Sequence, residues 1–347
     1  MSAPGYGHFT SLVPITLELA EAGIGVTIGV YDRWANEANW PHVRSVKLSS
    51  KGYPRPNDVP DWNVVRQRMA FEQWREAREV LLRTTPDAVV CDTSARGAQL
   101  AARELGIPTV LVCAPGDAPT AEFADRELIV LRDLWRTRHR SEGPPYSSAQ
   151  ILSVTYMPEE FYVGLPLRND LVHARWWDSR NSAIETSDER NWDVYWSVGT
   201  TSPSVDMLRA EIEVVRDAGL DVCVAEPTAD LAGALSGIDI VPFALARSAQ
   251  RRSRVTVCHG GASSVREALA AGRPVAVTPF HSDQFFMAMR VEDLGLGVRV
   301  SESGGAATLR AIRRCLGSPE IQGNVKEFKG AFDRLVPMAE LVRRIAE

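Results

Sequence analysis

The chain has 347 residues, of which 45% are hydrophobic and 24% charged, an ordinary globular balance with room for two domains. Its formal net charge of −5 argues against a nucleic-acid binder held by phosphate contacts. The five cysteines are far apart and form no C-x-x-C pair, so a disulfide framework or a zinc site is not expected and a reducing, cytoplasmic compartment fits best. We also expect no membrane span, because no apolar run approaches the roughly 20 residues that one requires.

Short apolar strands alternate with helices along the first half of the chain, as in a parallel sheet wrapped by helices. A glycine turn at 5–8 opens the chain and precedes a helical pattern over 12–22. A doubly wound domain normally has a central strand before such a turn. That first strand is missing, so we expect either a start codon assigned too late or a domain that lacks the strand. Further strands are expected at 25–30, 43–48, 87–92, 108–113 and 151–158, and helices at 62–83, 95–105 and 121–138.

The second half repeats the architecture after a polar, charged and aperiodic segment at 167–190, which we expect to link a domain at 1–166 to one at 191–347. The tail at 323–347 is expected to form helices that can cross back onto the first domain. Strands are expected at 192–199, 221–226, 238–242, 254–258 and 274–279, and helices at 205–218, 263–271, 284–294 and 308–316.

The most informative stretch is 259–297, HGGASSVREALAAGRPVAVTPFHSDQFFMAMRVEDLGLG. A Gly-Gly turn that leads into a helix lets backbone N–H groups approach an anion without a Cβ atom in the way. The helix N-terminus adds further donors and a partial positive charge, which together suit a diphosphate. Asp283 and Gln284 open the next helix and offer groups that bind hydroxyls. A sugar nucleotide is the predicted ligand, although such turns are common and a histidine at a strand end is more often structural.

Taken in order, these motifs resemble those of GT-B glycosyltransferases of the UDP-glycosyltransferase type, particularly bacterial enzymes that glycosylate macrolides and polyketides. The resemblance is strongest in HGGASSVREALAAGRPVAVTPFHSDQ, clear in GYGHFTSLVPITLELAEAGIGVTI and fair in VYWSVGT and DAVVCDTSARGAQLAARELGIPTVLV. It implies two facing Rossmann-like domains with the active site between them. The nucleotide sugar would bind mostly to the C-terminal domain and the acceptor mostly to the N-terminal one.

The resemblance also implies roles for individual residues. His8 would be the catalytic base and Asp92 its partner. Glu267 would bind the ribose, and Asp283 with Gln284 the sugar hydroxyls. The remaining implied residues line the nucleotide: Ser197 and Thr200 beside the diphosphate, Val241 and Phe243 at the base, and His259, Gly260, Gly261, Ser263 and Ser264 on the phosphates.

The chain departs from the family pattern in three places. Relatives often have proline where Ser11 stands and asparagine where Met287 stands, and the second change leaves the sugar preference open. The segment at 113–164, which normally shapes the acceptor pocket, is compact.

The implied reaction is a displacement at the anomeric carbon, in which an acceptor hydroxyl attacks and a nucleoside diphosphate leaves with inversion. A histidine suits removal of the hydroxyl proton near neutral pH, and a carboxylate behind it fixes its tautomer. His8 and Asp92 both follow strand ends, so both are expected at the carboxyl edge of the sheet. Asp92 as the cap of the following helix is the alternative. No carboxylate cluster resembles a Mg²⁺ site, so we expect no metal and no cofactor beyond a UDP- or dTDP-sugar co-substrate.

Three functions stay open. The first is an inverting glycosyltransferase acting on a small hydrophobic, hydroxylated acceptor. The second is a lipid-acceptor sugar transferase of the peptidoglycan type, which would need an apolar and basic docking surface. The third is a catalytically silent auxiliary protein that activates a partner glycosyltransferase; a homodimer is also compatible with the sequence. A nicotinamide dehydrogenase is disfavoured, because no G-x-G-x-x-G follows a strand.

Overall fold

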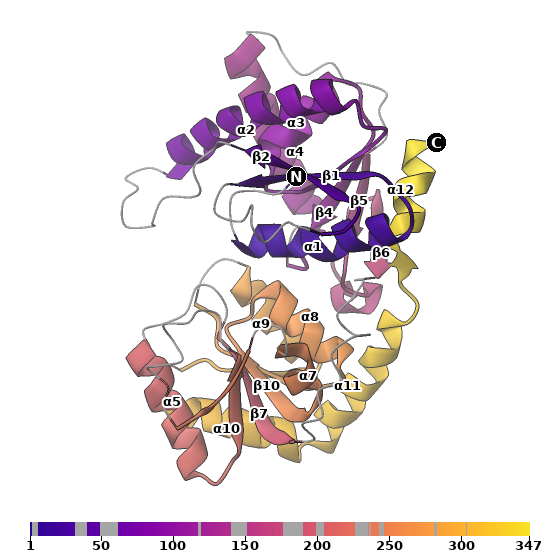
Figure 1. The fold of residues 1–347 in the computed structure, drawn as a ribbon. Coiled ribbons are helices and arrows are strands. Elements are labelled where there is room, and N and C mark those ends of the chain that lie inside the picture. Colours follow the sequence, from indigo (N-terminus) through magenta and orange to yellow (C-terminus); the bar gives the residue numbers. More distant parts are fainter. Residues whose placement is uncertain are drawn as a thin grey trace.

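The structure is a computed structural model that describes residues 1, 6–31, 40–48, 62–116, 119–139, 151–175, 190–198, 205–225, 235, 237–242, 246–280, 283–302 and 304–347. Within these ranges the strands form a five-stranded sheet, a six-stranded sheet and a two-stranded pair. Figure 1 shows two lobes, each built on one of the larger sheets with helices packed around it. The expected α/β architecture of two Rossmann-like units is confirmed.

The first lobe is built on a parallel sheet with the strand order β13-β6-β5-β4-β3. Every residue of β4, which lies between β5 and β3, is buried, because helices cover both faces. Leu111 packs with helices α2, α3 and α4, whereas Val110 and Val112 pack with α1 and α12 on the opposite face, as the two-residue repeat of a strand requires. The elements are α1 (Tyr6–Glu21), α2 (Trp62–Thr84), β3 (Val89–Asp92), α3 (Arg96–Glu104), β4 (Thr109–Cys113), α4 (Ala121–His139), β5 (Ile151–Thr155), β6 (Leu171–Arg175), β13 (Val336–Pro337) and α12 (Met338–Ala346).

Strands β1 (Val26–Tyr31) and β2 (Val43–Leu48) pair in parallel with each other and with no other described strand. Met1 lies between this pair and β3, since it packs against the apolar clusters of both. Its ammonium group donates to Val90 O at 2.6 Å, and its carbonyl accepts the N–H of Asp92 at 3.4 Å. These are the two bonds of one parallel rung opposite Cys91. Among the described strands, none but β4 pairs with β3, so Met1 lies along the other edge of β3, at the position of the strand that the sequence lacks.

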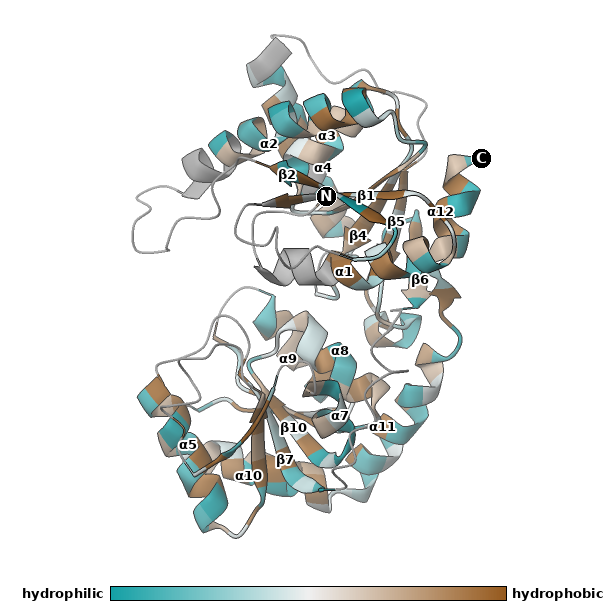
Figure 2. Ribbon diagram, viewed as in Figure 1, coloured by the Kyte–Doolittle hydropathy of each residue, from teal (hydrophilic) through white to brown (hydrophobic). Residues whose placement is uncertain are grey.

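The second lobe is built on a parallel sheet with the order β12-β11-β10-β7-β8-β9. The order reverses between β7 and β10, and ligands of such sheets bind outside the carboxyl ends of the strands at that point. The elements are β7 (Trp192–Ser197), α5 (Val205–Asp217), β8 (Val222–Ala225), β9 (Asp239–Val241), α7 (Ala246–Arg251), β10 (Ser253–Cys258), α8 (Ala262–Ala270), β11 (Val275–Val277), α9 (Gln284–Asp293), β12 (Gly297–Arg299), α10 (Gly305–Gly317) and α11 (Pro319–Phe332). Figure 2 shows hydrophobic strands enclosed by helices that carry hydrophilic residues.

Buried contacts join the two lobes. The guanidinium of Arg290 on α9 donates to Phe161 O at 2.9 Å and to Val163 O at 3.0 Å, in the turn η3 (Glu159–Tyr162) and just after it. The ring of Phe161 meets that of Phe328 on α11 edge-on at 6.3 Å. The tail crosses back to the first lobe, as the sequence analysis allows: β13 pairs with β6, and the N–H of Ala339 donates to Glu18 Oε1 on α1 at 2.9 Å.

Two elements differ from the expectations. Helix α1 begins at Tyr6, not near residue 12, so His8 lies inside the helix and not in a turn before it. A glycine in a helix costs only about 1 kcal/mol, and burial of Leu12, Ile15 and Leu19 offsets it. Strand β6 lies within the segment expected to be a linker, because its mostly half-buried side chains leave little alternation to detect. Among the described residues, no helix has the length and apolar character needed to cross a membrane.

Candidate functional site

The candidate site lies where the strand order of the second sheet reverses. Ser197 ends β7 and Cys258 ends β10, and the two residues are paired across the strands. The hydroxyl of Ser197 lies 2.8 Å from that of Ser264, in the first turn of α8. The structure thus brings together the carboxyl end of β7 and the first turn of α8, the helix that follows β10.

The turn between β10 and α8 requires glycine. Gly260 has a φ of +88°, and a Cβ atom on it would lie 2.9 Å from Val277 Cγ1 and 3.0 Å from Gln284 O. A Cβ atom on Gly261 would lie 2.7 Å from Nε2 of His259, so the imidazole lies against the turn. Gly261 is also the N-cap of α8 and contributes no side-chain cap, which leaves the first N–H groups of the helix to other acceptors.

Asp283 and Gln284 lie beside this turn, at the start of α9. Gln284 is buried, and its Cβ and carbonyl oxygen confine Gly260 together with Val277 Cγ1. Its Oε1 accepts the N–H of Phe280 at 2.9 Å, so that oxygen already holds the preceding loop. Asp283 lies at the side facing the first lobe, where it meets Gly116 after β4. The predicted turn and the predicted hydroxyl-binding pair are therefore neighbours.

Glu267 projects from α8 one turn beyond Ser263 and Ser264. Its Oε1 accepts from Nε and Nη2 of Arg247, at 3.1 and 3.0 Å, and from Nη2 of Arg266 at 3.2 Å. Arg247 lies on α7, directly after the strand that ends at Val241. Val241 is buried in a cluster with Trp192, Tyr195 and Ala246. Thr200 and Phe243 lie outside the described residues.

Asp92 is buried at the end of β3, and its Oδ1 accepts the N–H of Ser94 at 2.8 Å. It does not cap the following helix, because the N-cap of α3 is Ala95. The side chain of His8 lies outside the described part of the chain, so its pairing with Asp92 stays a prediction.

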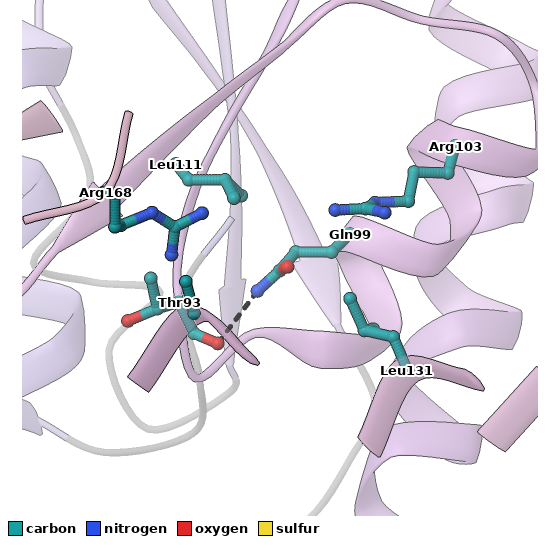
Figure 3. Close-up of a pocket in the computed structure, with 7 residues that line it drawn as sticks. Thr93, Gln99, Arg103, Leu111, Leu131 and Arg168 are labelled. Atoms are coloured by element: carbon teal, nitrogen blue, oxygen red, sulfur yellow. Dashed lines mark hydrogen bonds between the residues drawn. The ribbon is translucent and has the colours of Figure 1, made fainter. Parts of the chain in front are cut away.

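A small cavity lies behind the loop that follows β3 and begins at Asp92. The side-chain amide of Gln99 donates to Thr93 O at 2.8 Å (Figure 3). It also donates to Asp92 O at 3.4 Å. The cavity has a volume of about 10 Å³, on the order of one water molecule. The residues that line it are Thr93, Gln99, Arg103, Leu111, Ala124, Leu131 and Arg168. The loop that carries Asp92 is thus pinned from its inner side.

The described residues contain no group of three His, Cys, Asp or Glu side chains placed to hold a metal ion. All five cysteines are buried thiols. Burial raises the pKa of Cys258, next to the glycine turn, to about 12. A thiol with that pKa is a poor nucleophile, so the candidate site has no reactive cysteine at this position.

Sequence reasoning missed three residues of the site region: Arg247, Gly116 and Arg290. Arg247 lies in the polar run ARSAQRR, which has no periodicity to separate one arginine from the next. Gly116 and Arg290 matter through residues more than a hundred positions away in the chain. No local pattern carries that information.

Comparison with known proteins points to one class. Residues 209–309 match the family model described as the glycosyltransferase family 28 C-terminal domain, a range that includes the glycine turn, α8 and the start of α9. A sterol 3-beta-glucosyltransferase of Vanderwaltozyma polyspora is 36% identical over 73 residues, which are 21% of this chain and 6% of that relative. The match to this curated relative is thus confined to a short segment.

Several solved structures match the whole chain, and two of them serve as examples. The glycosyltransferase SnogD from Streptomyces nogalater has a TM-score of 0.76 at 20% identity, with 100% of this chain and 98% of that chain covered. The spinosyn rhamnosyltransferase SpnG complexed with thymidine diphosphate has a TM-score of 0.77 at 18% identity, with the same coverage. The fold is that of the GT-B glycosyltransferases. Within this fold, the second lobe carries a sequence match to the C-terminal domain of glycosyltransferase family 28.

Proposed function

We propose that the chain is an inverting glycosyltransferase that moves a sugar from a UDP- or dTDP-sugar to a hydroxyl of a small apolar acceptor, without a metal or further cofactor. One observation carries the proposal: the glycine turn at 259–261, the Ser197–Ser264 hydroxyl pair and the Asp283–Gln284 pair lie around one point at the sheet's reversal. Such a point in a parallel sheet is where nucleotides bind.

In this proposal the diphosphate lies at the N-terminus of α8. The N–H groups of the first turn and the hydroxyls of Ser197, Thr200, Ser263 and Ser264 donate to its oxygens, with His259 beside them. Charge grows on the diphosphate as it leaves, and preformed donors at a helix N-terminus stabilise that charge. Val241 and Phe243 border the base, Glu267 binds the ribose, and Asp283 with Gln284 bind the sugar.

The acceptor hydroxyl approaches from the first lobe. His8 takes its proton while the oxygen attacks the anomeric carbon, and the bond from that carbon to the diphosphate oxygen breaks with inversion. Asp92 orients the imidazole and stabilises its protonated form. We propose an acceptor domain at 1–166, a linker at 167–190 that also contributes β6 to the first sheet, and a nucleotide-sugar domain at 191–347 whose last residues, β13 and α12, return to the first lobe. The five cysteines are present as thiols, which suits the cytoplasm as the place of this reaction.

The test has a binding arm and a turnover arm. Calorimetry measures binding of UDP and dTDP to the purified chain. Mass spectrometry then follows transfer from UDP- and dTDP-sugars to polyketide, macrolide and flavonoid acceptors. We expect binding of at least one nucleotide, turnover that survives a chelator, and loss of turnover in His8→Ala with nucleotide binding retained.

Failure to bind either nucleotide would overturn the proposal. Loss of turnover on chelation would remove the metal-free mechanism. Binding without turnover, together with activation of a partner transferase that His8→Ala leaves intact, would identify the auxiliary protein instead.

A further inference from the structure

Glu267 is held by two arginines in an asymmetric way. Nε and Nη2 of Arg247 and Nη2 of Arg266 all donate to the same carboxylate oxygen, Oε1, at 3.0–3.2 Å. The hydrogen bonds from Arg247 Nε and Arg266 Nη2 therefore converge on Oε1 and not on Oε2. The Glu267 side chain is 23% exposed, against 5% for Arg266 and 19% for Arg247, so the carboxylate is the most accessible member of the cluster.

This arrangement fixes the direction of the carboxylate. A glutamate on a helix surface ordinarily samples several rotamers, and ordering it on a ligand costs side-chain entropy. Charge-assisted bonds from a planar guanidinium hold one oxygen in a defined geometry. The second oxygen is then preoriented as an acceptor before any ligand arrives.

The position of Glu267 along α8 indicates which part of a bound nucleotide would contact its second carboxylate oxygen, Oε2. Glu267 follows Ser264 by three residues, so the two share a helix face and lie about 5 Å apart along the axis. Ser264 lies at the seat proposed for the diphosphate, through its contact with Ser197. On the other side, α7 carries Arg247 and begins with Ala246, which packs with Val241 at the proposed base site. The oxygen therefore lies between the proposed phosphate and base positions, where a nucleotide has its pentose.

We propose that Arg247 is a positioning residue that orients Glu267 toward the two adjacent hydroxyls of a ribose, and that this makes the site select ribonucleoside over 2′-deoxyribonucleoside diphosphates. The inference rests on the proposed function. An oriented carboxylate oxygen accepts from both the 2′- and the 3′-hydroxyl of ribose, whereas a deoxyribose offers only the 3′-hydroxyl. UDP is thus the preferred nucleotide and dTDP the poorer one.

The test compares UDP with 2′-deoxy-UDP, which has the same base and diphosphate and lacks one hydroxyl. Calorimetry on the intact chain should give a dissociation constant for 2′-deoxy-UDP roughly tenfold above that for UDP, the effect of one hydrogen bond to a charged group. In Glu267→Gln and Arg247→Ala the ratio should fall toward one, chiefly through weaker UDP binding. Arg247→Lys keeps the charge and loses the planar fork, so it should give an intermediate ratio.

The matched control is Arg254→Ala. Arg254 makes a comparable ion pair with Asp193, at 2.8 Å, but at the amino ends of the strands, away from the site. This variant should keep the parent ratio, and thermal melting should show that all variants fold.

The possible results distinguish a failure of ribose selection from a failure of the proposed function. A parent chain that binds UDP and 2′-deoxy-UDP equally overturns the ribose selection and leaves the proposed function standing. Equal weakening of both nucleotides in Arg247→Ala overturns the positioning role and makes Arg247 merely structural. Failure to bind both nucleotides overturns the proposed function itself.

Discussion

Gly116 and Asp283 meet across the two lobes of the molecule. A Cβ atom on Gly116 would lie 3.0 Å from Cβ and 3.4 Å from Oδ2 of Asp283. Gly116 ends a tight turn after β4, in which its N–H donates to Ala114 O at 2.7 Å. Asp283 is the N-cap of α9. Because glycine has no side chain, the first lobe can approach the carboxylate that we propose to bind the transferred sugar.

Gly116→Ala should weaken sugar transfer without unfolding the chain. The added methyl displaces Asp283 by a few tenths of an ångström or holds the lobes slightly apart, and misplacement at a reacting centre is costly. We expect a several-fold rise in KM for the nucleotide sugar, with the free energy of unfolding changed by less than about 0.5 kcal/mol. Gly323→Ala, at an open position on α11, is the control. Unchanged kinetics in Gly116→Ala would show that this contact does not govern the reaction.

Gly260→Ala should abolish nucleotide binding. The residue has a left-handed φ of +88°, and the new methyl would meet both Val277 and the backbone oxygen of Gln284. Strain and crowding together should destabilise the fold by about 1–3 kcal/mol and move the first turn of α8. Gly272→Ala separates the two effects, because its φ is +70° but its methyl meets only the flexible Lys329 side chain. That control should lose stability and keep nucleotide affinity, as measured by urea unfolding and calorimetry.

Much of the site could be predicted because it follows strand ends. Ser197, the turn at 259–261 and the Asp283–Gln284 pair each follow a buried apolar run, and a parallel sheet brings such ends to one edge. The contacts that fix the site have no such signal. Arg247 holds Glu267 from another helix, and Arg290 binds carbonyls of residues far away in the sequence. A single sequence does not reveal which distant group an arginine meets.

The side of the first sheet formed by β13 and β6 was also not predictable from the sequence. Strand β13 has only two residues, and β6 is only partly buried, so neither shows the alternation that marks a strand. The start of α1 was misplaced because glycines near a helix start look like a turn. Packing against a sheet overrides that local preference.

A short Val/Ile/Thr extension before Met1 should stabilise the first lobe. The ammonium group of Met1 is buried against Val90 O, and desolvation lowers its pKa. Converting the ammonium group to an amide removes that buried charge, and the added residues can continue the rung opposite Cys91 along β3. Thermal melting should show a higher Tm, and the Val90 amide, which faces this free edge, should exchange with solvent more slowly.

The pH dependence of the free energy of unfolding provides a second test of the effect of this extension. With a pKa below 8.0 in the folded state, the terminal amine of the parent binds fewer protons than in the unfolded state, so stability rises with pH up to about 8. The extension should flatten that rise. The control is the same extension with prolines at the positions that pair with β3, since proline cannot donate to the ladder. Equal melting temperatures for the two extensions would contradict strand addition at this edge.

Glu18→Gln should leave the tail docked and reduce the pH dependence of stability. Glu18 is buried in α1, where its Oε1 accepts the N–H of Ala339 at the start of α12. Burial raises its pKa above 4.5, with the bond from Ala339 and the charge of Arg175 opposing that rise. A raised carboxyl pKa favours the folded state fully below pH 4.5, and this contribution is lost as the pH rises through the folded value. The charged carboxylate is therefore a cost at neutral pH.

Glutamine keeps the accepting oxygen and cannot ionise. In urea unfolding at neutral pH, Glu18→Gln should be at least as stable as the parent, and its stability relative to the parent should decline as the pH falls toward 4.5. Glu18→Ala leaves the Ala339 N–H without this acceptor and should lose about 1–3 kcal/mol at every pH. The matched surface control is Glu213→Gln, whose carboxylate pairs with Arg209 in an exposed contact on α5. If Glu18→Gln and Glu18→Ala lost stability equally at neutral pH, the carboxylate charge itself would be what holds the tail in place, and the proposed cost of its burial would be wrong.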